Sequence, residues 1–288
     1  MIDDWQLDSI RRAKAARIDP AVPNAARVAD FLNGDRNNFE ADRRAARIML
    51  GAAPAIAAIV PAVLAFQQRA ARFLAAEAGV RQFIDVGTGL PGVETNRDIF
   101  RSAGPQCRVV YVDNDPMVLS YVRAFSVSAS PGTVAALDAR LTDPVSLLAG
   151  AAETLDLRRP VAVLLPSTLP FIPSATRAAA VMSVLLAGLC PGSYLALCHV
   201  ASDLDPAVEA GAEHWNWMSS LRVTLRSRAE VAGFVEGLDL LEPGLVPVNE
   251  WRPAPAEAGP AGPAVPAGPA VPAYAVVARK PGSARPTG

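Results

Sequence analysis

An aspartate that precedes closely spaced glycines is the feature of the sequence best suited to bind a ligand. The stretch FIDVGTGLPG, residues 83–92, contains Asp85 followed by Gly87, Gly89 and Gly92 in the spacing G-x-G-x-x-G. Glycines at these positions let a ligand approach the backbone closely, and the same spacing holds pyrophosphates in dinucleotide-binding folds. A carboxylate beside the loop repels a pyrophosphate but attracts an ammonium group.

A second acidic residue places fewer limits on the cofactor. Asp113 ends the apolar run RVVYVD, 21 residues after Gly92, where an acid accepts hydrogen bonds from ribose hydroxyls. NAD and S-adenosylmethionine both present such hydroxyls, so Asp113 does not separate them. Asp85 favours S-adenosylmethionine, because the methionyl end of that cofactor carries an ammonium. An NAD-dependent oxidoreductase and a glycine turn without a ligand remain as alternatives.

Apolar runs alternate with helical patterns from residue 81 onward. Five runs predict strands, at 81–86, 108–113, 133–138, 160–165 and 193–200. Two last strands are predicted at 238–248 and 273–280. This alternation predicts an α/β fold with a doubly wound, mostly parallel sheet. Ligands bind such sheets at the carboxyl ends of the strands, and the glycine loop after the first strand marks that edge.

The first part of the chain, residues 1–66, has a helical pattern. Its uncharged span 48–66 approaches the length of a membrane helix. Gly51, Pro54 and Pro61 interrupt the span, and helix breakers at that density predict two short helices buried against a domain. We therefore expect no membrane insertion.

The remaining chain, residues 67–281, is the predicted sheet domain and begins with an amphipathic helix at 67–78. Within it, the Pro-, Ala- and Gly-rich stretch 253–273 predicts a surface loop with polyproline character. Residues 282–288 are expected to form a flexible tail.

The composition argues against several classes of protein. A net charge of −1 does not favour general binding to nucleic acid or to a membrane surface. The three cysteines, Cys107, Cys190 and Cys198, are an odd number without C-x-x-C spacing, so we expect neither a disulfide framework nor a metal site. Free thiols suit a reducing cytoplasm, and the charged N-terminus lacks the apolar region of a signal peptide.

Two histidines and two tryptophans are the candidates for catalysis and substrate binding. His199 lies at the end of the fifth predicted strand, where a histidine is well placed to act as a general base. A hydrogen bond to the backbone is its structural alternative. His214, Trp215 and Trp217 lie in the stretch EHWNWM and are candidates for substrate contact, with the two rings as an aromatic wall or cation–π face. Burial as ordinary core aromatics is their alternative.

Six motifs stand in a characteristic order: IDPAVPNAARVADFLNGDRNNFEADR, FIDVGTGLP, RVVYVDNDPMVL, RPVAVLL, PGSYLALCHVASD and EPGLVPVNEWRP. In this order they resemble the actinobacterial S-adenosyl methyltransferase family, formerly a domain of unknown function, within the class I methyltransferases. The resemblance covers residues 18–281. It implies a Rossmann-like sheet of seven strands, the last one antiparallel, with helices on both faces. It also implies that residues 1–66 form a helical cap over the cofactor, S-adenosylmethionine.

The resemblance further implies cofactor-binding residues by their positions. It places Asp85, Gly87, Thr88 and Gly89 around the methionyl group. The other positions are Asp113 at the ribose, Asn114 near the adenine, Asp138 and Ala139 at the adenine amine, and Arg36, Asn38 and Phe39 of NGDRNNF near the site. Local capping and packing remain the alternative for the last three.

The sequence departs from the family pattern at three places on the expected site. Arg140 stands where the family carries an acid, and Pro170, on the substrate side, stands where histidine is frequent. Ala29 and Phe31 stand around Asp30, where tyrosines are common in the family. We expect an S-adenosylmethionine-dependent methyltransferase that acts on a small molecule in specialised metabolism. Because these departures fall on the cofactor and substrate faces, a binding protein without methyl transfer, serving regulation or assembly, remains the alternative.

Overall fold

The computed structural model describes residues 18–90, 98–100, 104, 106–126, 132–253 and 269–282. Gly92, the N-terminal residues 1–17, most of the Pro-rich stretch and the last six residues lie outside the described residues.

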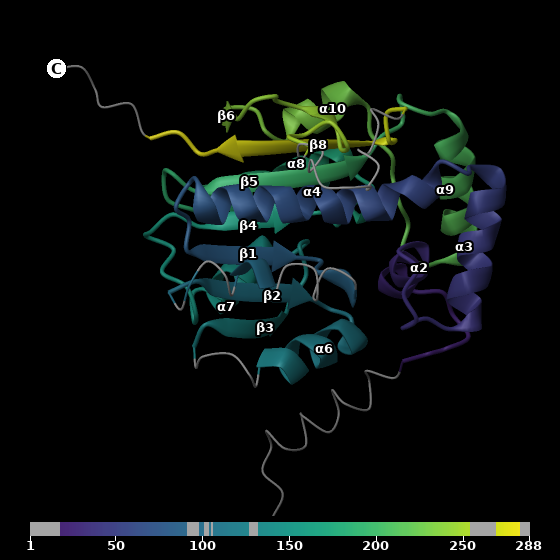
Figure 1. Ribbon diagram of the computed structural model, residues 1–288, viewed down its shortest axis with the longest axis horizontal. Helices are drawn as coiled ribbons and strands as arrows, with labels where there is room; N and C mark the ends of the chain where they lie inside the picture. The colour runs from purple at the N-terminus through teal and green to yellow at the C-terminus, as the bar shows by residue number, and fades with distance from the viewer. Residues whose placement is uncertain are drawn as a thin grey trace, which may run out of the picture.

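A twisted sheet forms the centre of the molecule (Figure 1). Its strands follow the order β3-β2-β1-β4-β5-β8-β6, with β7 paired to β8 beside that path. The strands are β1 (Gln82–Val86), β2 (Arg108–Asp113), β3 (Val134–Asp138), β4 (Ala162–Leu165), β5 (Tyr194–Val200), β6 (Asp239–Leu240), β7 (Val246–Pro247) and β8 (Ala273–Arg279). β1 to β5 are parallel and β8 is antiparallel to β5. The predicted α/β fold with a mostly parallel sheet is therefore confirmed.

The strand predicted at 238–248 is divided in two. β6 pairs with Ala278 and Arg279 near one end of β8, and β7 pairs with Tyr274 and Ala275 near the other. Pro243 and Gly244 separate the two pieces, and Gly244 has a φ of +84°. Proline cannot donate a ladder hydrogen bond, so the apolar run LDLLEPGLVPV does not form one continuous strand.

Apolar side chains are buried on both faces of the sheet, as its parallel strands require. Neighbouring residues of β1 alternate between the two cores, because Phe83 belongs to one cluster and Ile84 to the other. Helices α4 (Ile56–Ala76) and α6 (Pro116–Ser126) contribute to the first core, and α7 (Pro144–Ala151), α8 (Ala175–Ala187) and α10 (Arg228–Gly233) to the second.

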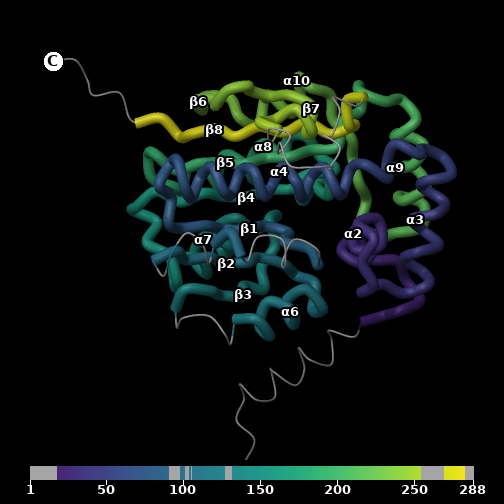
Figure 2. Tube along the Cα trace, viewed as in Figure 1, coloured from purple at the N-terminus to yellow at the C-terminus, as the bar shows by residue number. Residues whose placement is uncertain are grey.

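Three helices stand beyond the carboxyl ends of the strands: α2 (Ala25–Leu32), α3 (Glu40–Ala52) and α9 (Ala207–Met218). Helices α3 and α9 run side by side there (Figure 1). With the first turns of α4 they form what we call the cap. Figure 2 traces how the chain passes from α3 through a sharp corner into α4, which then continues along the sheet.

Helix α4 crosses the expected domain boundary at residue 66 without interruption. Two helices do share the span 48–66, the end of α3 and the start of α4, but the prediction that they are short is wrong. The chain breaks only at the corner 53–55, and Pro61 lies inside α4. Pro61 stands in the second turn, where it removes a single intrahelical hydrogen bond, and the buried face around Ile59, Val63 and Phe66 continues past it.

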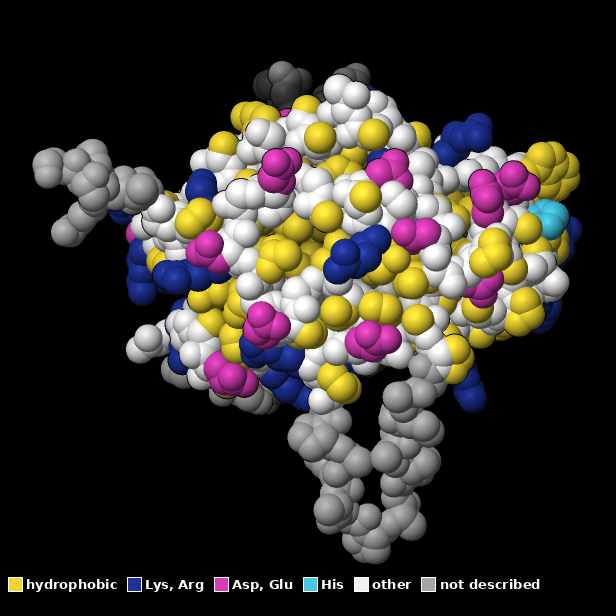
Figure 3. Space-filling model, turned by 90° about the horizontal axis from the view of Figure 1, so that it is seen from above, with side chains coloured by type: hydrophobic (Ala, Val, Ile, Leu, Met, Phe, Trp, Pro, Cys, Tyr) yellow, Lys and Arg dark blue, Asp and Glu magenta, His cyan; other side chains and the backbone are white. Residues whose placement is uncertain are grey.

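Within the described residues no single helix is long and apolar enough to cross a bilayer. Only α3 and α4 together reach that length and composition, and they are bent by 109°. On the face shown in Figure 3, acidic and basic side chains are interspersed with apolar ones.

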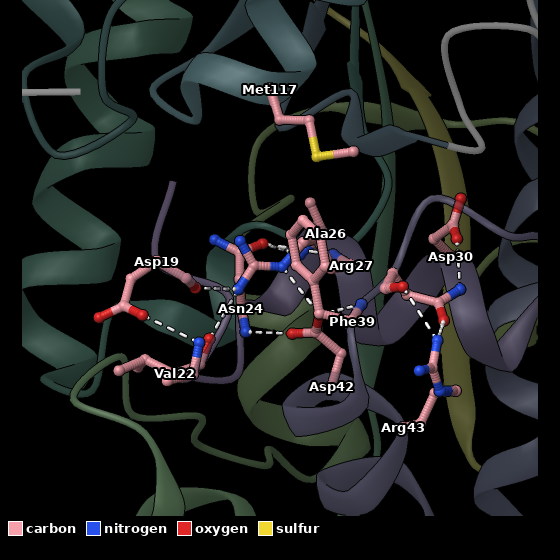
Figure 4. A network of polar contacts seen from close by, with 12 residues as sticks. Asp19, Val22, Asn24, Ala26, Arg27, Asp30, Phe39, Asp42, Arg43 and Met117 are labelled. Atoms are coloured by element: carbon pink, nitrogen blue, oxygen red, sulfur yellow. Dashed lines mark hydrogen bonds and ion pairs between the residues drawn. The ribbon is translucent and has the colours of Figure 1, made fainter. Parts of the chain in front are cut away.

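A buried ion pair organises the beginning of the cap (Figure 4). Arg27 Nε lies 2.8 Å from Asp42 Oδ2, and the two side chains are 5% and 0% exposed. Asp42 also accepts hydrogen bonds from the backbone N–H groups of Asn24 and Phe39. Arg27 donates its remaining hydrogen bonds to backbone carbonyls. Every charge in this network is thus paired, which buried charges require.

We expect Asp42→Ala to lower the free energy of unfolding by about 3–5 kcal/mol, because it leaves the buried Arg27 without its counter-charge. Urea denaturation measures the loss. Glu40→Ala is the matched control, since Glu40 lies in the same first turn of α3 but pairs with Arg43 and Arg47 at the surface. That change should cost far less than Asp42→Ala, because surface ion pairs contribute little, and equal losses in the two variants would contradict the organising role of Asp42.

Candidate functional site

A cavity of about 420 Å³ lies where the carboxyl ends of the strands face the cap. This size falls within the usual range for small-molecule sites. One side consists of segments that follow four strands, which we call the strand-end edge: residues 87–89, 113–115, 139–142 and 166–168. This is where a doubly wound sheet binds ligands.

The other side, which we call the cap compartment, is almost entirely apolar. Its side chains come from α2, α3, α4, α9 and two adjoining loops, and only Ala29, Pro170 and Trp215 among them were singled out by the sequence. They are Val28, Ala29, Leu32, Met49, Ile56, Ile59, Val60, Val63, Leu64, Pro170, Phe171, Ile172, Val208, Ala212, Trp215, Leu221, Val223 and Leu225. The sequence predicted helices within residues 1–66, but not that they would line a cavity.

The glycine loop approaches the loop after β4 more closely than any side chain would allow. Gly87 has a φ of +68°, and a Cβ atom added there would lie 1.9 Å from the Oγ1 atom of Thr168. Thr168 in turn donates a hydrogen bond to the carbonyl of Val86 at 2.8 Å. Thr88 is buried and bonds the carbonyl of Asp85. Glycine at position 87 thus lets the Thr168 side chain lie directly against the backbone of the glycine loop.

Asp113 sits at the end of β2 with its carboxylate held by backbone donors. Oδ1 accepts from the N–H groups of Asn114 and Asp115, and Oδ2 accepts from Gly89 at 3.3 Å. Burial raises the pKa of the Asp113 carboxyl above its ordinary value, and the backbone hydrogen bonds oppose that rise. Two carboxylate oxygens offer about four acceptor positions, so one position remains for a ligand hydroxyl.

Asp85 lies beneath the cavity and is not among the residues that line it. Its side chain is 0% exposed, and its Oδ1 accepts a hydrogen bond of 2.9 Å from Nε2 of Gln67. Gln67 itself lines the cavity. No motif marks Gln67 in the sequence, because a glutamine on an amphipathic helix belongs to no recognisable pattern.

The three residues predicted from NGDRNNF do not line the cavity. Arg36 is exposed. Asn38 donates to Asp30 Oδ2 and accepts from Arg43, while Phe39 begins α3 and packs under the guanidinium of Arg27. Asn38 and Phe39 therefore have the capping and packing contacts that were the alternative to ligand contact.

His199 is placed away from the cavity, so its predicted role as a base does not fit this geometry. It is 0% exposed. Nδ1 bonds the carbonyl of Val200 at 2.8 Å, and Nε2 accepts from Arg226 at 2.7 Å. Arg226 also donates to the carbonyls of Leu169 and Ile172, which flank the short helix η1 (Leu169–Phe171). The pair therefore supports one wall of the cap compartment.

The other predicted residues are divided between the cavity and the surface. Asn114, Ala139, Pro170 and Trp215 line the cavity, as do Gly87, Thr88, Gly89 and Asp113. Trp215 is buried and donates from Nε1 to the carbonyl of Leu221. Asp138 and His214 are exposed, and Trp217 is 87% exposed. Arg140, the first departure from the family pattern, also lines the cavity.

Among the described residues, no group of three or more His, Cys, Asp or Glu side chains is placed to hold a metal ion.

Comparison with known proteins gives a match over nearly the whole chain. A family described as S-adenosyl methyltransferase matches residues 11–281. A DUF574 family protein from Streptomyces avermitilis is similar at 35% identity with a TM-score of 0.82, covering 92% of this chain and 100% of that one. No curated protein matches the chain.

Two further solved structures are similar. A candidate methyltransferase from Thermobifida fusca shares 32% identity with a TM-score of 0.80, covering 91% of this chain and 96% of that one. A possible exported protein from Bordetella parapertussis has 15% identity and a TM-score of 0.55, covering 91% of this chain and 80% of that one. The second likeness concerns the fold alone.

We expect Gly87→Ala to destabilise the protein by at least about 1 kcal/mol more than Gly79→Ala. Gly79 has a φ of +69° but no atom within 4 Å of an added Cβ, so its variant experiences only the strain of left-handed backbone, about 1–2 kcal/mol. Gly87→Ala must also displace Thr168 and lose its hydrogen bond. Urea denaturation of both variants measures the difference. Equal losses of unfolding free energy would show that the Thr168 side chain moves aside without cost, contrary to this prediction.

His199 should make the protein sensitive to acid. Burial lowers the pKa of His199 from 6.5 to about 4, and the Arg226 guanidinium acts in the same direction. The unfolded chain therefore takes up a proton that the folded chain does not, and stability is lost as the pH falls from 6.5 towards 4. Between pH 7.5 and pH 5 this contribution is about 2 kcal/mol.

His199→Gln keeps an acceptor for Arg226 but does not titrate in this range. The variant should lose about 2 kcal/mol less unfolding free energy than the wild type between pH 7.5 and pH 5. Urea denaturation at the two pH values measures this. A parallel loss in both proteins would show that His199 is not buried in its neutral form.

Proposed function

The chain belongs to the S-adenosyl methyltransferase family and is an S-adenosylmethionine-dependent methyltransferase, and we propose that it methylates a small, largely apolar acceptor held in the cap compartment. The single observation that supports this acceptor is the cavity itself, polar at the strand-end edge and apolar under the cap. The family match also decides between the two cofactors that the sequence left open, in favour of S-adenosylmethionine.

The strand-end edge fits the cofactor in the chemistry of its groups. Gly87, Thr88 and Gly89 line the cavity, and the glycines present backbone without a side chain to a ligand. Asp113 keeps an acceptor position for a ribose hydroxyl. Asn114 and Ala139 line the same edge, which supports their proposed place near the adenine. Asp138 is exposed one residue before Ala139, at the rim of this edge.

The cap compartment supplies a dry space next to that edge. When bound, S-adenosylmethionine supplies a methyl group activated by a sulfonium, and its transfer requires the nucleophile, the methyl carbon and the sulfur to be in line. The chain's contribution is to align the acceptor and to exclude water. Side chains such as Val60, Val63 and Phe171 are suited to an acceptor with apolar surface and cannot neutralise a charged one.

The described lining offers no group that is free to remove a proton from the acceptor. It contains no His, Cys, Lys, Tyr or Glu. Its two carboxylates, Asp113 and Asp115, lie at the strand-end edge and accept bonds from backbone N–H groups. Hydroxyl and amide acceptors require a base, whereas a thiolate or a neutral amine does not. This favours an acceptor whose nucleophile attacks without first losing a proton to the protein.

The cysteines support the proposed cytoplasmic location. Cys107, Cys190 and Cys198 carry no disulfide, as is usual in a reducing compartment. Burial raises the pKa of Cys107 to about 11 and that of Cys198 further, so neither thiol is a reactive nucleophile. A place in specialised metabolism stays a prediction.

The direct test is a transfer assay with methyl-labelled S-adenosylmethionine and small thiols and amines graded from apolar to charged. We expect labelled product and S-adenosylhomocysteine with the apolar acceptors. Labelling of protein, nucleic acid or charged molecules alone would contradict the proposed acceptor. Cofactor binding without transfer to any acceptor would favour the binding protein that the sequence left as an alternative.

Val60→Asp places a charge in the cap compartment and should raise KM for the acceptor about tenfold or more, equivalent to about 1.4 kcal/mol, because the carboxylate disfavours apolar contact. Affinity for S-adenosylhomocysteine, measured by calorimetry, should stay unchanged. Ala58→Asp is the control, since Ala58 is exposed on the same helix and does not line the cavity. Equal effects in the two variants would place the acceptor elsewhere.

A further inference from the structure

Gln67 carries a buried polar atom that has no partner among the described residues. Its side chain is 2% exposed and lines the cavity. Its Nε2 donates to Asp85 at 2.9 Å, while no described residue donates a hydrogen bond to its Oε1. Leaving a buried carbonyl oxygen unpaired is unfavourable, because it has lost its hydrogen bonds to water. An orphaned acceptor at the wall of a ligand cavity points to a donor on the ligand.

The orientation of this amide is fixed by chemistry. An ionised carboxylate only accepts hydrogen bonds, so the N–H₂ end of Gln67 must face Asp85 and the carbonyl end must face away from it. The Asp85 side chain, which is fully buried, does not line the cavity. The amide of Gln67 therefore lies between the Asp85 carboxylate and the ligand, and its carbonyl oxygen is the atom that a ligand donor would contact.

A cationic donor suits this acceptor best. Hydrogen bonds to charged groups are about twice as strong as neutral ones, and the negative charge of Asp85 behind the amide favours a positive group in front of it. Gln67 also lies beside the loop that begins at Gly87, directly after β1, since Asp85 is the fourth residue of that strand. A ligand held at the strand-end edge thus has its end nearest β1 close to this oxygen.

We propose that Oε1 of Gln67 accepts a hydrogen bond from the ammonium of the methionyl end of the cofactor, and that Asp85 is a positioning residue that orients the amide. This inference rests on the proposed use of the strand-end edge as the cofactor site. It assigns to Gln67 the direct contact that the sequence assigned to Asp85.

Calorimetry with two ligands tests the proposal. S-adenosylhomocysteine carries the amino-acid end, and 5′-methylthioadenosine has the same adenosyl and sulfur groups without it. Gln67→Met, which is close in size but lacks polar atoms, should weaken S-adenosylhomocysteine about tenfold to a hundredfold, as expected for loss of a charged hydrogen bond. Affinity for 5′-methylthioadenosine should change less than about twofold, since that ligand lacks the ammonium.

Two further variants complete the test. Asp85→Asn removes the charge that fixes the amide and should produce the same selective loss of S-adenosylhomocysteine. Gln68→Met is the matched control, because Gln68 is the next residue of α4 and does not line the cavity, and it should leave both affinities unchanged. Binding of 5′-methylthioadenosine reports that each variant retains a folded site.

Equal weakening of both ligands by Gln67→Met, or an unchanged affinity for S-adenosylhomocysteine, would overturn the role of Gln67 while leaving the cofactor site in place. If the wild-type protein binds neither ligand, the proposed cofactor site fails first and the role of Gln67 fails with it.

Discussion

The hydrogen bond between Gln67 of α4 and Asp85 of β1 links the helix that begins in the cap to the central sheet, at the floor of the cavity. A carboxylate fully buried in a strand must be paired, because an isolated charge in that position is strongly unfavourable. Gln67 contributes to that pairing from α4, the helix that begins in the cap and continues along the sheet (Figure 1). The bond therefore ties α4, which packs against β4, β5 and β8, to β1 as well, at the point where the helix leaves the cap.

The cap is fastened to the same residues that form the strand-end edge. Asn24 caps α2 and also donates from Nδ2 to Asp115 at 2.7 Å, just beyond β2. Tyr121 of α6 bonds Asn37 in the loop between α2 and α3. The first contact lies two residues after Asp113, and the second is made by α6, the helix that follows. The apolar compartment under the cap and the polar edge are thus held in register by a small number of side-chain hydrogen bonds.

Much of the fold was predictable because its signals are local. Short apolar runs such as PVAVLL, bounded by turn residues, indicate buried parallel strands, and the glycine spacing predicted close approach to the backbone at Gly87, although not that Thr168 makes it. Pro61 was misleading because its effect depends on its place in the helix, which tertiary burial of Val63 and Phe66 decided. The predicted strand at 238–248 is divided into β6 and β7 because of one Pro-Gly pair within its apolar run.

The site was only partly predictable, because pairing across the fold decides which polar groups face a ligand. His199 has the right residue type at the right strand end, but Arg226, 27 residues later, occupies its Nε2. Asp85 was recognised from its motif, and Gln67 was not, because only the packing of α4 brings the two together. The measurement that tests this account most directly is a crystal structure with S-adenosylhomocysteine. We expect its amino group on the Gln67 oxygen, its ribose at Asp113 and its sulfur facing the cap compartment; an adenosyl group lying among the cap helices would contradict the account.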